Sequence, residues 1–328
     1  MNSFSYNKVT EVAEAVADLT GHANARFIAG GTNLLDLMKE NVARPDHLTD
    51  INKLALTAIE ETEDGGLSLG ALATNADTAW NELVERKYPL LSQAILAGAS
   101  PQLRNMATNG GNLFQRTRCY YFYDTATACN KREPGSGCSA INGINRIHAI
   151  LGTSEHCIAT HPSDMCVALA ALDAKVNVTG PYGDRVIEFR DFHRLPGDTP
   201  HLDNNVQDGE LVTSIELPPS NFTQHFHYLK VRERQSYAFA LVSVAAALEL
   251  DGNTIKDIRL ALGGVAHKPW RDCSCEEAFI GQEATEANFR ALAEMILADA
   301  KGYGSNTFKI ELAKRAIVRA FSEALKNN

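Results

Sequence analysis

The spacing of apolar residues changes along the first hundred residues and predicts a mixture of helices and short strands. Residues 7–20 carry small and branched apolar side chains at helical spacing, so we expect an amphipathic helix there. Residues 26–29 form a brief apolar run that suits a buried strand. Residues 46–72 alternate apolar and polar positions around a glycine turn, which predicts two short strands, and residues 75–100 are helical in pattern.

The next part of the chain contains an apolar helix and three strands. Residues 163–174 read as a helix, with Pro162 just before its start. Residues 175–188 predict a hairpin across a glycine-proline turn, and residues 211–217 predict a strand that runs into two prolines. These prolines, at positions 218 and 219, are the best candidate for a domain boundary.

Beyond the two prolines, strands precede helices. Residues 225–231, 242–250 and 255–263 read as strands, and residues 275–325 as helices joined by glycine-containing loops. Several strands followed by helices are typical of an α+β domain. We therefore predict a first domain over residues 1–218 and a smaller one over residues 219–328.

Length and charge limit the partners. At 328 residues the chain has room for two domains with substantial cores. Its net charge of −9 argues against nucleic acid, which calls for clustered lysine and arginine. No stretch approaches the roughly 20 apolar residues of a membrane span. The N-terminus lacks the pattern of an export signal, so we expect the cytoplasm, although a partner with a signal could carry the folded chain to the periplasm.

A glycine pair follows the first predicted buried strand. The run AGGTNLLDLMK, residues 29–39, opens directly into a helical pattern. A strand, a glycine turn and a helix start in this order can offer free backbone N–H groups to a phosphate. The alternative is a tight connection that binds nothing. The spacing is neither that of a Rossmann fingerprint nor that of a P-loop.

Two further segments could lie against the same ligand. The run LGALAT, residues 69–74, ends a predicted strand in small residues that let a ligand approach the backbone, although plain strand-to-helix packing explains it equally well. Residues 105–112, NMATNGGN, form a second glycine turn in a polar setting. This turn could also present N–H groups to an anion.

Four of the seven cysteines, Cys119, Cys129, Cys138 and Cys157, lie in loop-like sequence directly after the second glycine turn. Four thiolates with wrapping loops suit a [4Fe–4S] cluster. Structural zinc is an alternative, although its ligands are usually closely spaced pairs, and unliganded thiols are another. Cys166 falls in the apolar helix and reads as a core residue, and we interpret Cys273 and Cys275 as structural.

The motifs AGGTNLLDLMK, LGALAT, RNMATNGGNLFQRTRC, HPSD and YLKVRER resemble, in order and spacing, the FAD-binding subunit of the xanthine dehydrogenase and molybdenum hydroxylase family. The resemblance covers essentially the whole chain. Each motif is weak alone, but the combination is specific. The cysteine-bearing insertion makes the chain most similar to the subtype that adds a [4Fe–4S] cluster, as in aldehyde oxidoreductases.

The resemblance implies a two-lobed FAD-binding domain of the vanillyl-alcohol-oxidase (PCMH) type over residues 1–218, with an iron–sulfur insertion at about residues 115–160. A smaller domain of the CO dehydrogenase flavoprotein C-terminal type would follow. The cluster ligands would be the four cysteines named above. The implied FAD contacts are Ile28, Ala29, Gly30, Gly31, Thr32, Asn33, Leu34, Leu35, Ala71, Thr74, Leu103, Ala107, Thr108, Gly111, Asn112, Asp164, Leu211, Val212 and Lys230.

The function implied by the resemblance is electron transfer within a heterotrimer. A partner with a molybdenum cofactor would oxidise an aldehyde, a partner with [2Fe–2S] clusters would relay electrons, and FAD would pass them to an external acceptor. Residues 236–239 read SYAF where the family has an acidic residue, so NAD is not carried over as the acceptor. The external electron acceptor is therefore left open among oxygen, ferredoxin, a quinone and NAD.

No side chain is predicted to act as a catalytic acid or base, because the sequence shows no triad, HExxH motif or convincing carboxylate pair. Two rival functions stay open. The chain could be a self-contained FAD oxidase with its own substrate pocket, which would turn over without partners. It could also be a binding module stabilised by zinc, which would be colourless.

Overall fold

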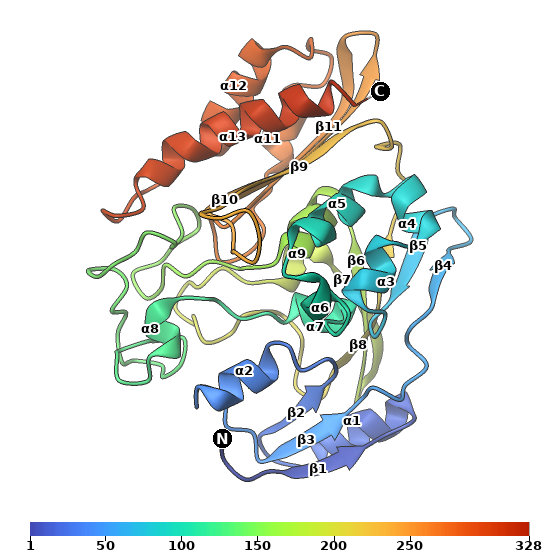
Figure 1. Ribbon diagram of the computed structural model, residues 1–328, viewed down its shortest axis with the longest axis vertical. Helices are drawn as coiled ribbons and strands as arrows, with labels where there is room; N and C mark the ends of the chain where they lie inside the picture. The colour runs from blue at the N-terminus through green and yellow to red at the C-terminus, as the bar shows by residue number, and fades with distance from the viewer. Residues whose placement is uncertain (328) are drawn as a thin grey trace.

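The computed structural model describes residues 1–327, and the first of its three sheets lies in the N-terminal lobe (Figure 1). This sheet is parallel, with strand order β1-β3-β2. Parallel pairing requires crossover connections between the strands. Here α1 connects β1 to β2, and α2 connects β2 to β3. The lobe comprises β1 (Ser5–Lys8), α1 (Val12–Thr20), β2 (Ala25–Ile28), α2 (Leu34–Lys39) and β3 (His47–Asp50).

The second lobe of the first domain is built on a five-stranded antiparallel sheet of order β4-β5-β8-β6-β7. Helices α5 and α9 pack together in its core, and α9 is buried along its whole length. The elements are β4 (Ile59–Glu61), β5 (Leu67–Gly70), α3 (Asn75–Ala79), α4 (Glu82–Lys87), α5 (Pro89–Ala97), α6 (Pro101–Arg104), α7 (Asn109–Leu113), α8 (Tyr120–Tyr123), α9 (Asp164–Ala171), β6 (Lys175–Gly180), β7 (Gly183–Glu188), α10 (Phe189–Phe192) and β8 (Leu211–Leu217).

The third sheet is antiparallel, with order β11-β10-β9, and carries helices on one face (Figure 1). Its central strand is buried over its first seven residues because its other face packs against α5 and α9 of the first domain. The two domains therefore share apolar contacts. The elements are β9 (His225–Val231), β10 (Val242–Asp251), β11 (Thr254–Gly263), α11 (Cys273–Glu277), α12 (Glu286–Ile296) and α13 (Phe308–Ala324).

The cysteine-bearing segment, residues 115–160, is mostly loop and lies beside both the N-terminal lobe and the C-terminal domain (Figure 1). A separate apolar cluster anchors this segment. In it, Leu37 of α2 packs with Phe122, Ala140 and Ile158 of the segment, and the partly buried Tyr303 of the C-terminal domain packs against them. Within residues 1–327, no helix combines the length and apolar composition of a membrane span.

Most predicted elements are confirmed, and the differences have local causes. The predicted helix at residues 7–20 begins only at Val12, since Ser5–Lys8 forms β1, whose mostly exposed side chains give no apolar pattern. The segment 46–72 holds three short strands rather than two, because β3 precedes the predicted pair. The strands at residues 211–217 and 225–231 have the predicted bounds.

Candidate functional site

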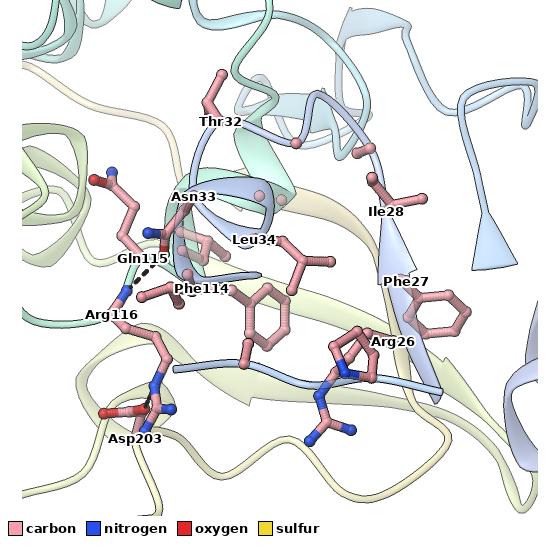
Figure 2. A pocket seen from close by; sticks show the side chains of 18 of the residues that line it. Arg26, Phe27, Ile28, Thr32, Asn33, Leu34, Phe114, Gln115, Arg116 and Asp203 are labelled. Atoms are coloured by element: carbon pink, nitrogen blue, oxygen red, sulfur yellow. Dashed lines mark hydrogen bonds and ion pairs between the residues drawn. The ribbon is translucent and has the colours of Figure 1, made fainter. Parts of the chain in front are cut away.

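A cavity of about 840 Å³ opens between the two lobes of the first domain (Figure 2). This volume is in the range of cofactor sites. Both glycine turns and the start of β8 contribute to its wall, together with residues from the cysteine-bearing segment and from residues 193–210. Figure 2 shows Thr32, Asn33 and Leu34, which follow the glycine pair, and Ile28, Phe27 and Arg26 of β2.

The first glycine turn leaves backbone donors free. No backbone N–H of residues 30–33 donates to an acceptor within residues 1–327. The Nδ2 of Asn33 is buried and has no hydrogen-bond partner there either, whereas its Oδ1 accepts from the backbone N–H of Arg116 at 3.0 Å. The Asn33 amide is a buried donor of the kind that is normally paired, and together with the partly exposed free backbone N–H groups it indicates a ligand with acceptor oxygens such as a pyrophosphate.

Glycine at position 30 is required by a close approach of two chains. A Cβ on Gly30 would stand 1.8 Å from the carbonyl oxygen of Met106, in the second turn. Gly31 has φ +71°, a left-handed conformation that favours glycine. The glycine pair therefore lets the first turn lie directly on the second.

The second turn is held by side chains from neighbouring elements. Thr108 caps α7 by accepting a hydrogen bond from the backbone N–H of Gly111 at 3.2 Å. The buried Asn109 side chain donates to Thr78 Oγ1 at 2.8 Å and to the carbonyl oxygen of Gly70 at 3.3 Å. These bonds fix the turn against β5, which brings Ala71 to the cavity wall.

Twelve of the predicted FAD contacts line the cavity. They come from four separate stretches of the chain, which the fold brings together. They are Ile28, Ala29, Gly30, Gly31, Thr32, Asn33, Leu34, Ala71, Thr108, Gly111, Leu211 and Val212.

The other seven predicted contacts lie outside the cavity wall, so their contact with FAD stays a prediction. Thr74 and Thr108 form an isolated β-bridge, and the backbone N–H of Ala107 donates to the carbonyl oxygen of Leu103 in α6 at 2.8 Å. Asn112 is bonded to Asn75 and Ser163. The seven residues are Leu35, Thr74, Leu103, Ala107, Asn112, Asp164 and Lys230.

The sequence interpretation missed several polar residues of the wall, among them Arg26, Arg116, His193, Asp203 and Glu210. His193 is buried, and its Nε2 is 2.9 Å from the carbonyl oxygen of Leu113. Burial lowers the pKa of His193 to about 4, so the imidazole is neutral at pH 7. No spacing signal marks these residues as a group, since they come from segments that are distant in sequence and, apart from Arg26 in β2, lie in loops or at element ends.

Asp203 joins the cavity to the cysteine-bearing segment. Its Oδ2 accepts from Nε of Arg116 at 2.7 Å, and its Oδ1 accepts from Nζ of Lys131 at 2.5 Å (Figure 2 shows the first pair). Only 1% of the Lys131 side chain is exposed. Despite the desolvation of Asp203 by burial, these two cations hold the pKa of its carboxyl well below its usual range.

We expect Asp203→Asn to lower the free energy of unfolding by about 3 kcal/mol, because it leaves the buried Lys131 ammonium without a counter-charge. The ionised carboxylate contributes stability above the ordinary aspartate pKa of about 3.9, and this contribution is lost as the pH falls through the lower folded-state value. Urea unfolding at pH 7 with saturating FAD checks the first effect. The control Asp198→Asn, at a 98% exposed side chain, should change stability by less than about 0.5 kcal/mol, and equal values for both variants would contradict the assignment.

The four predicted cluster ligands converge. Cys119, Cys129, Cys138 and Cys157 all line one narrow cavity, and Cys129 and Cys138 face each other in an isolated β-bridge. All four are free cysteines. Burial raises the pKa of Cys119 to about 12 and that of Cys157 to about 11, so these thiols are protonated at pH 7 unless a cation replaces the proton.

The four cysteines share one cavity, but no three of their sulfur atoms lie within 4.8 Å of one another. Within residues 1–327, groups of three candidate metal-ligand atoms within 4.8 Å of one another occur at His161, Cys166 and His193 and at Asp18, His22 and His47, but not among the four cysteines. A single zinc ion with bonds of about 2.3 Å would hold its sulfurs about 3.8 Å apart. The arrangement is therefore too open for one zinc ion.

Polar groups surround the cysteine cavity. The Nε2 of His148 lies 3.0 Å from Sγ of Cys119, and the backbone N–H of Ala159 donates to Sγ of Cys157 at 3.4 Å. Burial lowers the pKa of His148 to about 4, so this imidazole is neutral. Lys131 lines the same cavity. Neutral and charged donors therefore face the sulfurs, as in sites that hold anionic clusters.

The second domain contacts the first through buried ions close to the HPSD motif. Asp164 Oδ2 pairs with Nζ of Lys230 at 2.7 Å, and its Oδ1 accepts from the hydroxyl of Tyr228 at 2.8 Å. The two predicted contacts Asp164 and Lys230 are thus brought together, although neither lines the cavity. Their pairing fixes β9 against the start of α9.

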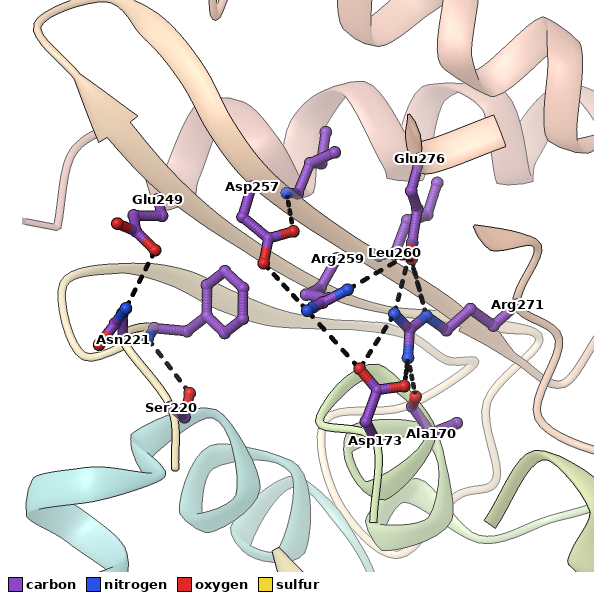
Figure 3. Close-up of polar contacts among 12 residues, drawn as sticks. Ala170, Asp173, Ser220, Asn221, Glu249, Asp257, Arg259, Leu260, Arg271 and Glu276 are labelled. Atoms are coloured by element: carbon purple, nitrogen blue, oxygen red, sulfur yellow. Dashed lines mark hydrogen bonds and ion pairs between the residues drawn. The ribbon is translucent and has the colours of Figure 1, made fainter. Parts of the chain in front are cut away.

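A second ionic contact between the domains lies at the other end of α9 (Figure 3). Arg271 of the second domain donates to Asp173 at 2.6 Å, to the carbonyl oxygen of Ala170 at 2.7 Å and to Glu276 at 2.9 Å. Arg259 approaches the same aspartate at 3.6 Å. With contacts at both ends of the helix, the second domain is held in one orientation.

Comparison with known proteins finds matches along nearly the whole chain. Residues 2–220 match the family described as the FAD binding domain in molybdopterin dehydrogenase, and residues 227–324 match the CO dehydrogenase flavoprotein C-terminal domain. The aldehyde oxidoreductase FAD-binding subunit PaoB of Escherichia coli is 51% identical over 325 residues, which cover 99% of both chains.

More distant relatives share the same extent. The glyceraldehyde dehydrogenase medium chain of Sulfolobus acidocaldarius is 31% identical, and the match covers 98% of each chain. Among solved structures, a chain of carbon monoxide dehydrogenase from Hydrogenophaga pseudoflava superposes with a TM-score of 0.77 at 25% identity, over 99% of this chain and 98% of that one.

Proposed function

Because the chain belongs to the FAD-binding subunits of the molybdenum hydroxylase family, we propose that it is the electron-transfer flavoprotein of an aldehyde oxidoreductase. The predicted family, the α+β fold class and the oxidoreductase class are confirmed by the family matches. The 51% identity to an aldehyde oxidoreductase subunit supports the aldehyde as the substrate class of the whole complex.

FAD fits the large cavity because free backbone donors and glycines without side chains meet there. The N–H groups of residues 30–33 and the Asn33 amide would bind the pyrophosphate. Leu211 and Val212 would flank the flavin ring system. Bound FAD would supply a centre that accepts electrons singly or in pairs. The protein's own part is to hold this group, to shield it from water and to leave an edge open to an acceptor.

A [4Fe–4S] cluster is our proposal for the four cysteines. Each thiolate of such a cluster binds a different iron, so the sulfurs stand further apart than around a single metal ion, in agreement with their spread here. Bound at this site, the cluster would supply a one-electron centre. The backbone N–H of Ala159, Nε2 of His148 and the Lys131 ammonium would offset its negative charge.

The observation that carries the electron-transfer role is the short connection between the two cavities. Asp203 lines the large cavity, Lys131 lines the cysteine cavity, and the two side chains are in direct contact. The Asp203–Lys131 ion pair thus joins the wall that would hold FAD to the wall that would hold the cluster. The proposed complex adds a molybdenum-cofactor subunit and a [2Fe–2S] subunit, and an external molecule takes the electrons.

Aldehyde addition under anaerobic conditions tests this role. We expect the flavin absorbance of the isolated chain to stay unchanged with an aldehyde such as benzaldehyde, and to bleach when the chain is part of the complete complex. A self-contained FAD oxidase would instead bleach in the isolated chain. Bleaching without partners would therefore overturn the proposal.

A further inference from the structure

We propose that His148 is a positioning residue that raises the reduction potential of the cysteine site by donating a hydrogen bond from Nε2 to the sulfur of Cys119. The two atoms are 3.0 Å apart. The inference rests on the proposed cluster at the four cysteines and adds to it a residue that binds no metal. It concerns the properties of the site rather than its existence.

The direction of the hydrogen bond follows from the chemistry of both partners. A cysteine sulfur bound to iron carries no proton and can only accept. Of the two ring nitrogens of His148, Nε2 is the one that faces the sulfur, so Nε2 must carry the proton of this hydrogen bond. The other nitrogen, Nδ1, is buried and has no hydrogen-bond partner within residues 1–327. The sulfur is the single polar atom that this imidazole meets there.

The second domain fixes the backbone that carries this imidazole. Lys309 of α13 donates from Nζ to the carbonyl oxygen of His148 at 2.8 Å and to that of Gly264 at 2.5 Å. Asn306 donates to the neighbouring carbonyl of Ala149 at 2.9 Å. Both Lys309 and Asn306 are fully buried. Two buried side chains of the opposite domain thus hold the carbonyl groups of two successive loop residues, His148 and Ala149.

Aromatic rings exclude water from the same place. The ring of Tyr121 lies 6.4 Å from that of His148 and the ring of Tyr120 lies 6.5 Å away, both measured between centroids. Only 1% of His148 is exposed. In such a dry setting one hydrogen bond to a ligand sulfur has a large electrostatic effect. It stabilises the more negative, reduced form of the centre and so raises the potential.

Substitution at position 148 tests the inference through the potential. In anaerobically purified chain, we expect His148→Leu to lower the midpoint potential of the iron–sulfur signal in a redox titration followed by electron paramagnetic resonance. His148→Gln retains an N–H donor and should recover part of the shift. The control His156→Leu removes a half-exposed imidazole that also lines the cysteine cavity but bonds no sulfur, and should leave the potential unchanged.

A measurement on the unaltered chain covers the case in which the Leu variant fails to take up iron. With ¹⁵N-labelled histidine, pulsed electron paramagnetic resonance of the reduced centre should show one weak nitrogen coupling through the hydrogen bond, absent in His148→Gln. Lack of this coupling, or equal potentials in the unaltered and Leu chains, would overturn the inference while the cluster stands. An unaltered chain that binds no iron would overturn the proposed cluster itself.

Discussion

Gly30→Ala is expected to abolish the retention of FAD through purification. The new Cβ would stand 1.8 Å from the carbonyl oxygen of Met106, far inside van der Waals contact, so the two glycine turns must separate. Overpacking typically costs about 1–3 kcal/mol, and a clash this close with the backbone lies at the upper end of that range. Because FAD binding requires the two turns to be in contact, a cost of this size lowers the affinity for FAD by about 100-fold. Isothermal titration of the FAD-free chain with FAD measures the change.

Gly21→Ala is the matched control for this variant. Gly21 is exposed at the end of α1, and a Cβ there meets nothing closer than 3.2 Å. The FAD affinity of the Gly21→Ala chain should equal that of the unaltered chain. Circular dichroism should show that both variants are folded. Unchanged FAD affinity in a folded Gly30→Ala chain would show that the contact between the turns does not shape the site.

Cys138→Ser is expected to remove most of the iron while FAD stays bound. Serine oxygen is a hard ligand that replaces a soft thiolate poorly, and a cluster that loses one of its four protein ligands is readily lost. Cys138 lines the cysteine cavity but not the large one, so the FAD site keeps all of its wall residues. Iron analysis by mass spectrometry, set against flavin absorbance, measures both quantities in one sample.

Cys273→Ser serves as the control for the iron measurement, because Cys273 is an exposed cysteine on α11 and is far in sequence from the four proposed ligands. Its iron and FAD contents should match those of the unaltered chain. A Cys138→Ser chain that keeps its full iron content would contradict the ligand assignment.

Local sequence patterns predicted the elements that depend on neighbouring residues. The β8 strand and the apolar α9 helix were found because their spacing and flanking prolines are local signals. The first glycine turn was found for the same reason, since glycine pairs between a strand and a helix are short-range features. The sequence also predicted that the four cysteines lie together, because four cysteines in one loop-like segment suit the ligand set of a single cluster.

Contacts between distant segments could not be predicted. Asp203 pairs with Lys131 across 72 positions of the chain, and nothing in the pattern of either segment shows this pair. His148 meets Cys119 across 29 positions, and its backbone is held by Lys309 of the opposite domain. The strand β1 was missed because its mostly exposed side chains carry no apolar alternation. Such features arise from tertiary packing, which overrides local propensity.

Iron, acid-labile sulfide and FAD measured in the same anaerobically purified chain test the central claim most directly. If the two neighbouring cavities hold a flavin and a four-iron centre, each FAD should be accompanied by about four iron and four sulfide, with flavin bands above a broad charge-transfer shoulder. A chain that carries stoichiometric FAD and no iron, or one zinc ion per chain, would contradict the account.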